Sequence, residues 1–318
     1  MEPTIWKAVN LLRRQYFQLV DLEHLQWPNS EFLKKVDVQA WIYQNLFDEG
    51  KLQSPPPIRY QARVLKQLVS RIEGAIVDPE EDEISDDLIS RLSMLLSSKL
   101  PSESIAAQQR AFVTYTYPTC TTESSASVER AITVFESRAV FSSSGTTGLR
   151  TWEAALHLGT FLTSEVGAKL IRGKNVLELG AGTGLLSILC ARHLEASRVI
   201  ATDGDEGVVD AIRTNIFLNG LENDEDRSIE SAILRWGWAL DATSFSEDYG
   251  IESLDVVIGA DVTYDKSVIP ALVSTLSELF DLNSSLEVVI AAAIRNEKTF
   301  ETFFNACSGS LRVCLMTD

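Results

Sequence analysis

The chain has 318 residues, of which 45% are hydrophobic, and a formal net charge of −17. This length suffices for two domains, each with its own core. The negative charge would repel a phosphate backbone, so we expect no nucleic-acid partner and favour a partner or substrate group that carries positive charge. No continuous apolar segment is long enough for a signal peptide or a membrane span, so we expect no membrane association.

The cysteines and histidines point to no metal site. Four cysteines are scattered along the chain without a C-x-x-C pair, which indicates neither a disulfide framework nor a zinc site. Reduced thiols are typical of the cytosol, so we expect a cytoplasmic protein. The three histidines fall in no catalytic cluster, and a histidine-based hydrolase is therefore not expected.

Residues 1–110 have the pattern of a helical N-terminal region. We expect helices at 6–22, from about Ser30, around 64–72, and from a capped start at Ser85. Pro55, Pro56 and Pro57 form a stiff break between the second and the third. The pattern indicates a packed helical scaffold, and nothing in it favours a substrate-recruiting role.

The second region, residues 111–318, begins with strand signals. Residues 112–117 alternate between apolar and polar, and 131–135 are a second strand candidate. Polar loops are expected at 119–127, which we predict to be mobile, and at 142–148. A helix is then expected from about Thr151.

The stretch VLELGAGTGLLS, residues 176–187, organises this region. A short apolar run predicts a buried parallel strand, three glycines (Gly180, Gly182 and Gly184) follow at alternating positions, and a helical pattern comes next. Strand, glycine turn and helix open a doubly wound α/β domain, which binds ligands at the carboxyl edge of its sheet. The G-x-G-x-G spacing differs from that of a dinucleotide fold and from that of a phosphate loop.

Asp203 is the first feature that supports a nucleoside site. A second strand, 199–201, ends in Thr202 and Asp203, 19 residues after Gly184. An acid at the tip of this strand can accept hydrogen bonds from both hydroxyls of a ribose. The alternative is that Asp203 caps the next helix, a task that suits Asp205 better.

Trp236 is the second feature. It follows a third strand that we expect at 229–233. An indole at this position can stack on an adenine face. Large aromatic side chains are also mostly buried, so ordinary core packing explains Trp236 equally well.

The third feature is LDVVIGADVTY, residues 254–264. Its apolar centre predicts a fourth buried strand, and Gly259 and Ala260 are small where a ligand would lie over the strand end. Asp261 and Tyr264 then fall at the carboxyl edge, where α/β active sites are built. A solvated acidic loop is the alternative; it explains the other acids between 241 and 265 but not this compact arrangement.

Together these features indicate a site for a nucleoside without phosphate-binding chemistry. S-adenosylmethionine fits, because it needs a ribose acceptor and an adenine platform and carries no pyrophosphate. The chain resembles the seven-strand class I protein-lysine methyltransferases, which carry an acidic residue, two others, and then Tyr or Phe after the fourth strand. Here that motif is Asp261-Val262-Thr263-Tyr264. The stretch SGTTGLRTWEAAL, residues 144–156, after a helical region, is similar to the elongation factor 2 lysine methyltransferases.

This resemblance implies a Rossmann-like class I methyltransferase sheet of the α/β class and a protein substrate, elongation factor 2. It implies that Asp261 and Tyr264 hold the target lysine. The cofactor contacts that it implies are Trp152, Gly180, Ala181, Gly182, Asp203, Trp236 and Ala260. We expect a monomer.

The end of the sequence departs from the family pattern. After a helix expected at 296–306, only 311–316 can form a strand, so the closing hairpin of the fold is expected to lack its last strand. Two alternatives therefore stay open: a small-molecule methyltransferase, and a nonenzymatic binding module on a degenerate fold. The glycine spacing disfavours a third, an NAD-dependent oxidoreductase.

Overall fold

The computed structural model describes residues 1–78, 82–117, 129–138, 146–221, 228–240, 242–251 and 253–308. The chain divides into two compact units, residues 1–116 with 133–139, and residues 117–132 with 140–318. The loop expected at 119–127, most of the loop at 142–148 and the strand expected at 311–316 lie outside the described residues.

The N-terminal unit is helical, as the sequence predicts, and it includes most of a two-stranded sheet. Its elements are α1 (Pro3–Phe17), η1 (Leu22–His24), α2 (Ser30–Leu33), α3 (Val36–Ile42), the π-helical turn η2 (Tyr43–Phe47), α4 (Ile58–Glu73), α5 (Asp86–Ser97), α6 (Glu103–Gln108), β1 (Arg110–Tyr117) and β2 (Arg130–Ser137). The first helix ends earlier than predicted, because Leu19 adopts a left-handed backbone conformation (φ +56°) that a helix cannot continue.

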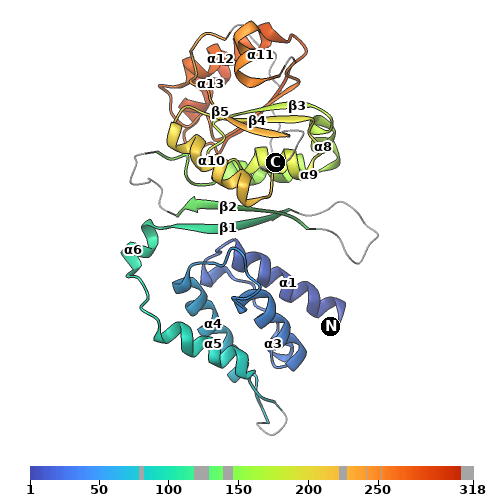
Figure 1. The fold of residues 1–318 in the computed structure, drawn as a ribbon, viewed down its shortest axis with the longest axis vertical. Helices are drawn as coiled ribbons and strands as arrows, with labels where there is room; N and C mark the ends of the chain where they lie inside the picture. The colour runs from blue at the N-terminus through green and yellow to red at the C-terminus, as the bar shows by residue number, and fades with distance from the viewer. Residues whose placement is uncertain are drawn as a thin grey trace. The chain divides into compact units, whose positions relative to one another are not determined.

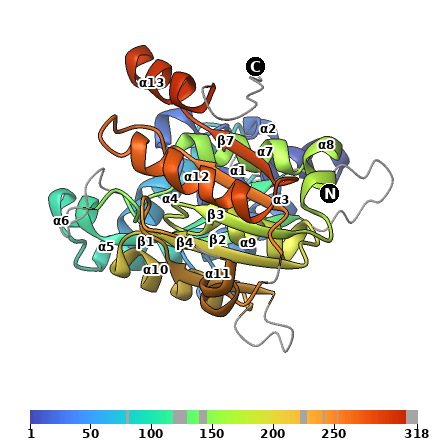
Figure 2. The same cartoon turned by 90° about the horizontal axis from the view of Figure 1, so that it is seen from above.

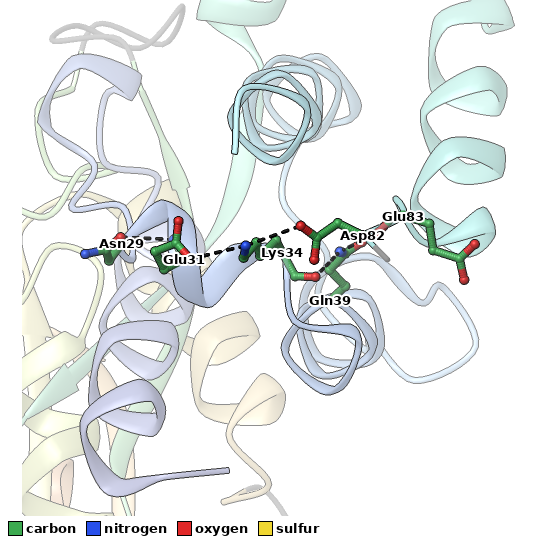
Figure 3. Close-up of polar contacts among 6 residues, drawn as sticks. All are labelled: Asn29, Glu31, Lys34, Gln39, Asp82 and Glu83. Carbon is green, nitrogen blue, oxygen red and sulfur yellow. Dashed lines mark hydrogen bonds and ion pairs between the residues drawn. The ribbon is translucent and has the colours of Figure 1, made fainter. Parts of the chain in front are cut away.

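Polar contacts fix the start of α5 in this unit (Figure 3). The Lys34 ammonium lies 3.2 Å from the Asp82 carboxylate, and the buried Gln39 amide donates to the backbone carbonyl of Glu83. The Gln39 carbonyl in turn accepts from the backbone N–H of Ser85, the residue that precedes α5. The predicted helix start at Ser85 is therefore correct in position, but the Ser85 side chain makes no capping hydrogen bond.

The second unit is a parallel sheet covered by helices. Its elements are α7 (Glu153–Leu162), α8 (Glu165–Ile171), β3 (Asn175–Leu179), α9 (Leu185–His193), β4 (Arg198–Asp203), α10 (Glu206–Leu218), β5 (Ile229–Ile233), α11 (Ala242–Tyr249), β6 (Val256–Ala260), α12 (Ile269–Leu282), β7 (Glu287–Ala291) and α13 (Glu297–Ser308). The strand order is β5-β4-β3-β6-β7, and every pairing is parallel. The four predicted strands and the α/β class are confirmed.

Helices cover both faces of this sheet. Figures 1 and 2 show α9 and α10 on one face and α11, α12 and α13 on the other. The central strands are consequently runs of buried apolar residues, such as Val256, Val257 and Ile258, without the alternation of a half-exposed strand. The strand order reverses at β3, which pairs with β4 on one side and β6 on the other. A ligand crevice is expected at the carboxyl ends of strands at such a switch point.

One charged side chain interrupts the buried run of β3. Glu178 is 2% exposed, and its carboxylate accepts hydrogen bonds from the backbone N–H (2.9 Å) and the hydroxyl of Ser187 on α9. Burial raises the pKa of Glu178 to about 8, although the two bonds from Ser187 lower it. Its carboxyl group therefore takes up a proton on folding at neutral pH.

This proton uptake predicts a pH dependence of stability. The pKa of Glu178 is higher in the folded than in the unfolded chain. The stabilisation that proton uptake by Glu178 provides is therefore complete below about pH 4.5 and is lost as the pH rises through about 8. Between pH 6 and 8.5 we expect the free energy of unfolding to fall by about 2 kcal/mol from this group. Urea unfolding across that range should show a flatter profile for Glu178→Gln than for the unsubstituted chain.

The control is Glu301→Gln, which changes an exposed acid on α13. It should keep the slope of the unsubstituted chain. Equal slopes for Glu178→Gln and the unsubstituted chain would contradict the assignment of the effect to Glu178.

Candidate functional site

The turn after β3 is shaped by glycines that no other residue could replace without strain. Gly180, Gly182 and Gly184 all have positive φ, at 61°, 56° and 76°. A Cβ on Gly180 would lie 2.9 Å from the Val262 side chain, and one on Gly182 would lie 3.0 Å from the backbone oxygen of Gly148. The chain segments on either side of the turn therefore approach its bare backbone.

Asp203 lies beside this turn, at the end of β4. Its carboxylate accepts hydrogen bonds from the backbone N–H groups of Gly182 and Asp205, each at 3.2 Å. Burial raises the pKa of Asp203, and these backbone donors lower it. Asp205, by contrast, caps α10 by accepting from the backbone N–H of Val208 at 3.0 Å. Helix capping is thus performed by Asp205, which leaves Asp203 directed at the glycine turn.

Trp236 faces both the turn and the core. It is partly buried and packs against the apolar cluster that β3, β6 and α12 build. A Cβ on Gly180 would also lie 3.3 Å from its ring. The sequence leaves two interpretations of Trp236 open, a surface for adenine stacking and a core residue. The position of Trp236 is compatible with both.

Asp261 follows β6 in a strained conformation. Its backbone N–H extends the strand pairing by donating to the Ala291 carbonyl at 2.8 Å, and its φ is +53°. Few residues other than glycine adopt this region, and they cluster at functional sites. The Asp261 side chain is 7% exposed; one carboxylate oxygen accepts from the Ala293 N–H at 3.0 Å and the other lies 3.4 Å from the Arg295 guanidinium.

Arg295 connects Asp261 to the segment before α7. The same guanidinium lies 3.1 Å from the Glu153 carboxylate and 5.1 Å from the centre of the Trp152 ring. Arg150 lies 5.2 Å from that ring centre, and the Trp152 indole N–H donates to the Thr147 carbonyl at 3.1 Å. Trp152 is therefore held between cations, next to the carboxylate that follows β6.

Two contacts join the glycine turn to the Asp261 side of the site. The hydroxyls of Thr151 and Thr183 are 2.8 Å apart and buried, and Val262 packs over Gly180. Trp152 and the β6 end are thereby fixed relative to the turn. The predicted residues are brought to one edge of the sheet, where Ala260 pairs with Ala291 and Ala181 donates from its backbone N–H to the Thr202 carbonyl.

A cavity of about 220 Å³ is lined in part by Ala293 and Arg295, the two residues that hold the Asp261 carboxylate. It is lined by Thr263, Tyr264, Ala292, Ala293, Ile294, Arg295, Asn296, Thr299 and Phe300. Tyr264 itself is 61% exposed. The volume is below the roughly 300–1,000 Å³ of typical small-molecule sites.

Glu178 and Arg295 are absent from the sequence-predicted site. Glu178 stands inside the glycine motif, and an acid within a buried strand is itself an unusual signal. Arg295 comes four residues after the apolar strand β7, at the same carboxyl edge. Its pairing with Asp261 spans 34 residues and depends on the strand order, which the sequence alone does not provide.

Within the described residues, no group of three or more His, Cys, Asp or Glu side chains is placed to hold a metal ion. Searching the same residues for helices long and apolar enough to cross a membrane finds none.

Comparison with known proteins bears on the same part of the chain. A family model described as "Lysine methyltransferase" matches residues 138–310. Protein-lysine N-methyltransferase EFM3 of Chaetomium thermophilum is 49% identical over 294 residues, covering 92% of this chain and 84% of the relative. Protein-lysine N-methyltransferase EEF2KMT of Homo sapiens is 30% identical over 304 residues, covering 93% and 82%. The chain therefore belongs to the lysine methyltransferase family.

Proposed function

We propose that this chain is an S-adenosylmethionine-dependent protein-lysine N-methyltransferase whose substrate is elongation factor 2, and that it acts in the cytoplasm as a monomer. The observation that carries the proposal is the Asp261 carboxylate, oriented at the sheet edge between the Trp152 side of the site and the cavity lined by Tyr264. The family match and the similarity to EEF2KMT support the choice of substrate class.

The residues at the glycine turn fit S-adenosylmethionine. The glycines let Val262 and the Gly148 backbone lie close to the turn, and the Asp203 carboxylate beside it can accept two ribose hydroxyls. Trp236 offers a ring face beside the same turn. The residues that we assign to the cofactor are Trp152, Gly180, Ala181, Gly182, Asp203, Trp236 and Ala260. When bound, the cofactor supplies an electrophilic methyl group on a positively charged sulfur.

The protein's task is then to position a lysine amine for in-line displacement. We assign Asp261 to the capture and orientation of the incoming ammonium, and Tyr264 to the wall of the lysine channel. The ammonium must lose a proton before it can react, and with a free pKa of about 10.4 this costs roughly 4–5 kcal/mol at pH 7. The proton leaves to water, directly or by way of Asp261.

All of these residues lie in the second unit of the structure. We assign the methyltransferase function to a domain at 111–318, of which residues 111–116 and 133–139 group with the N-terminal unit in the structure. We treat residues 1–110 as a separate helical region that takes no part in the chemistry.

The direct test of this function is labelling in a lysate from cells that lack the enzyme. With tritiated S-adenosylmethionine, the chain should label one protein of the size of elongation factor 2. Label in small molecules only would indicate a small-molecule methyltransferase. No label, with cofactor binding intact in a calorimeter, would indicate a nonenzymatic module.

Replacement of Asp261 tests the lysine site. We expect Asp261→Asn to lower kcat by about 100-fold, because the amine loses its orienting charge, while the cofactor Kd stays nearly unchanged. Single-turnover labelling and calorimetry measure the two quantities. Asp265→Asn is the control, since Asp265 is exposed and its carboxylate accepts hydrogen bonds from Ser267 in its own turn. A collapse of cofactor binding in Asp261→Asn would refute the assignment.

Replacement of Asp203 tests the ribose site. An asparagine can accept only one of the two hydroxyl bonds and carries no charge, so we expect Asp203→Asn to raise the cofactor Kd by about 10-fold or more. Asp205→Asn is the matched control, because asparagine also caps helices well and Asp205 points to α10. Equal affinities for both variants would argue against ribose binding by Asp203.

A further inference from the structure

The Arg295 guanidinium makes three contacts, each with a residue at the edge of the proposed lysine site. It pairs with Asp261 at 3.4 Å and with Glu153 at 3.1 Å, and it lies over the Trp152 ring. Its side chain is about half exposed and also lines the 220 Å³ cavity. The site that we propose for the lysine ammonium therefore already contains a cationic side chain, Arg295.

This arrangement bears on an electrostatic conflict in the proposed reaction. A carboxylate that captures an ammonium also stabilises its charge, so an unpaired Asp261 would raise the pKa of the bound lysine. The reaction needs the opposite, because only the neutral amine has a free electron pair. A carboxylate alone would therefore hold the lysine in its charged form and oppose the proton loss that must come before methyl transfer.

We propose that Arg295 is a positioning residue that compensates the charge of Asp261, so that the substrate lysine is oriented by the carboxylate but loses its proton more easily. The proposal rests on the proposed function. The Asp261 carboxylate keeps its direction, because Ala293 N–H holds one oxygen at 3.0 Å and Arg295 lies beside the other. The lysine then meets a nearly neutral ion pair instead of a free negative charge.

Three other charged or titratable groups lie around this pair. Glu153 at the start of α7 faces Arg295 directly, Arg150 lies on the Trp152 ring, and Tyr264 lines the adjoining cavity. Asp261 and Glu153 together carry two negative charges against the positive charges of Arg295 and Arg150. Removal of Arg295 thus leaves an excess of negative charge at the site, whereas removal of Glu153 leaves an excess of positive charge.

The chemical step balances without any further reactant. The lysine ammonium gives one proton to solvent, and the amine's electron pair forms a bond to the methyl carbon. The carbon–sulfur bond breaks with its electrons passing to sulfur, which becomes a neutral thioether. The methylated nitrogen takes over the positive charge. Arg295 changes only the first equilibrium, the loss of the proton.

The test is the pH dependence of kcat at saturating cofactor, with elongation factor 2 from cells lacking the enzyme as substrate. The midpoint of the rise in kcat reports the pKa of the bound lysine. We expect Arg295→Gln to shift it by about one pH unit to alkaline values, with about a 10-fold loss of kcat at pH 7 that is recovered at high pH. Arg295→Lys, which keeps the charge, should restore the midpoint.

Glu153→Gln gives a test of opposite sign that leaves Arg295 and Asp261 in place. Because Glu153 is largely exposed, we expect a smaller shift, about 0.3 pH unit in the acid direction. If Arg295→Gln fails to fold or to bind cofactor, the shift of the midpoint in Glu153→Gln tests the proposal by itself. An alkaline shift or no shift in Glu153→Gln would then contradict the proposal.

A second readout needs no turnover. Calorimetric titration of elongation factor 2 into the cofactor-free chain, in buffers of different ionisation enthalpy, measures the protons released on binding. Between pH 7.5 and 9 the unsubstituted chain should release more than Arg295→Gln does. Equal proton release by the two chains, together with equal pH midpoints of kcat, would overturn the proposal. A lower KM in Arg295→Gln with an unchanged pH midpoint would also overturn it, because it would mean that Arg295 only occupies the lysine's place. Absence of methylation by the unsubstituted chain would instead refute the proposed function.

Discussion

The carboxylate of Asp261 is fixed from two directions, by the Ala293 N–H and by the Arg295 guanidinium, and the proposed chemistry depends on that fixation. Both partners follow β7, so the orientation of the carboxylate depends on the pairing of β6 with β7. The left-handed backbone at Asp261 is maintained by the same pairing, through its N–H bond to Ala291. The hydrogen bonds between β6 and β7 thus hold Asp261 in its strained conformation.

The same sheet explains why the cofactor side and the substrate side of the site are close. β3 lies between β4 and β6, so the glycine turn, Asp203 and Asp261 follow three adjacent strands. Parallel strands bring their carboxyl ends to one edge, and the reversal of strand order at β3 opens the crevice there. The contact of Val262 with Gly180 joins the two sides across this edge.

The sequence predicts much of this arrangement, because buried strands and glycine turns are local signals. The strands β3, β4, β5 and β6, the helix start at Ser85 and the capping role of Asp205 are confirmed. The end of α1 was predicted five residues too late, since the left-handed Leu19 has no signature in apolar periodicity. The roles of Arg295 and Glu178 could not be predicted, because each depends on a partner that only the tertiary fold brings near.

Mass spectrometry of elongation factor 2 after reaction with the chain tests whether Asp261 directs methyl transfer to a lysine. The substrate should come from cells that lack the enzyme, and its peptides should be mapped before and after addition of S-adenosylmethionine. The proposed function predicts added methyl groups on a single lysine with the unsubstituted chain, and about 100-fold slower addition with Asp261→Asn. Methylation of another type of side chain, or no methylation while S-adenosylmethionine still binds, would contradict it.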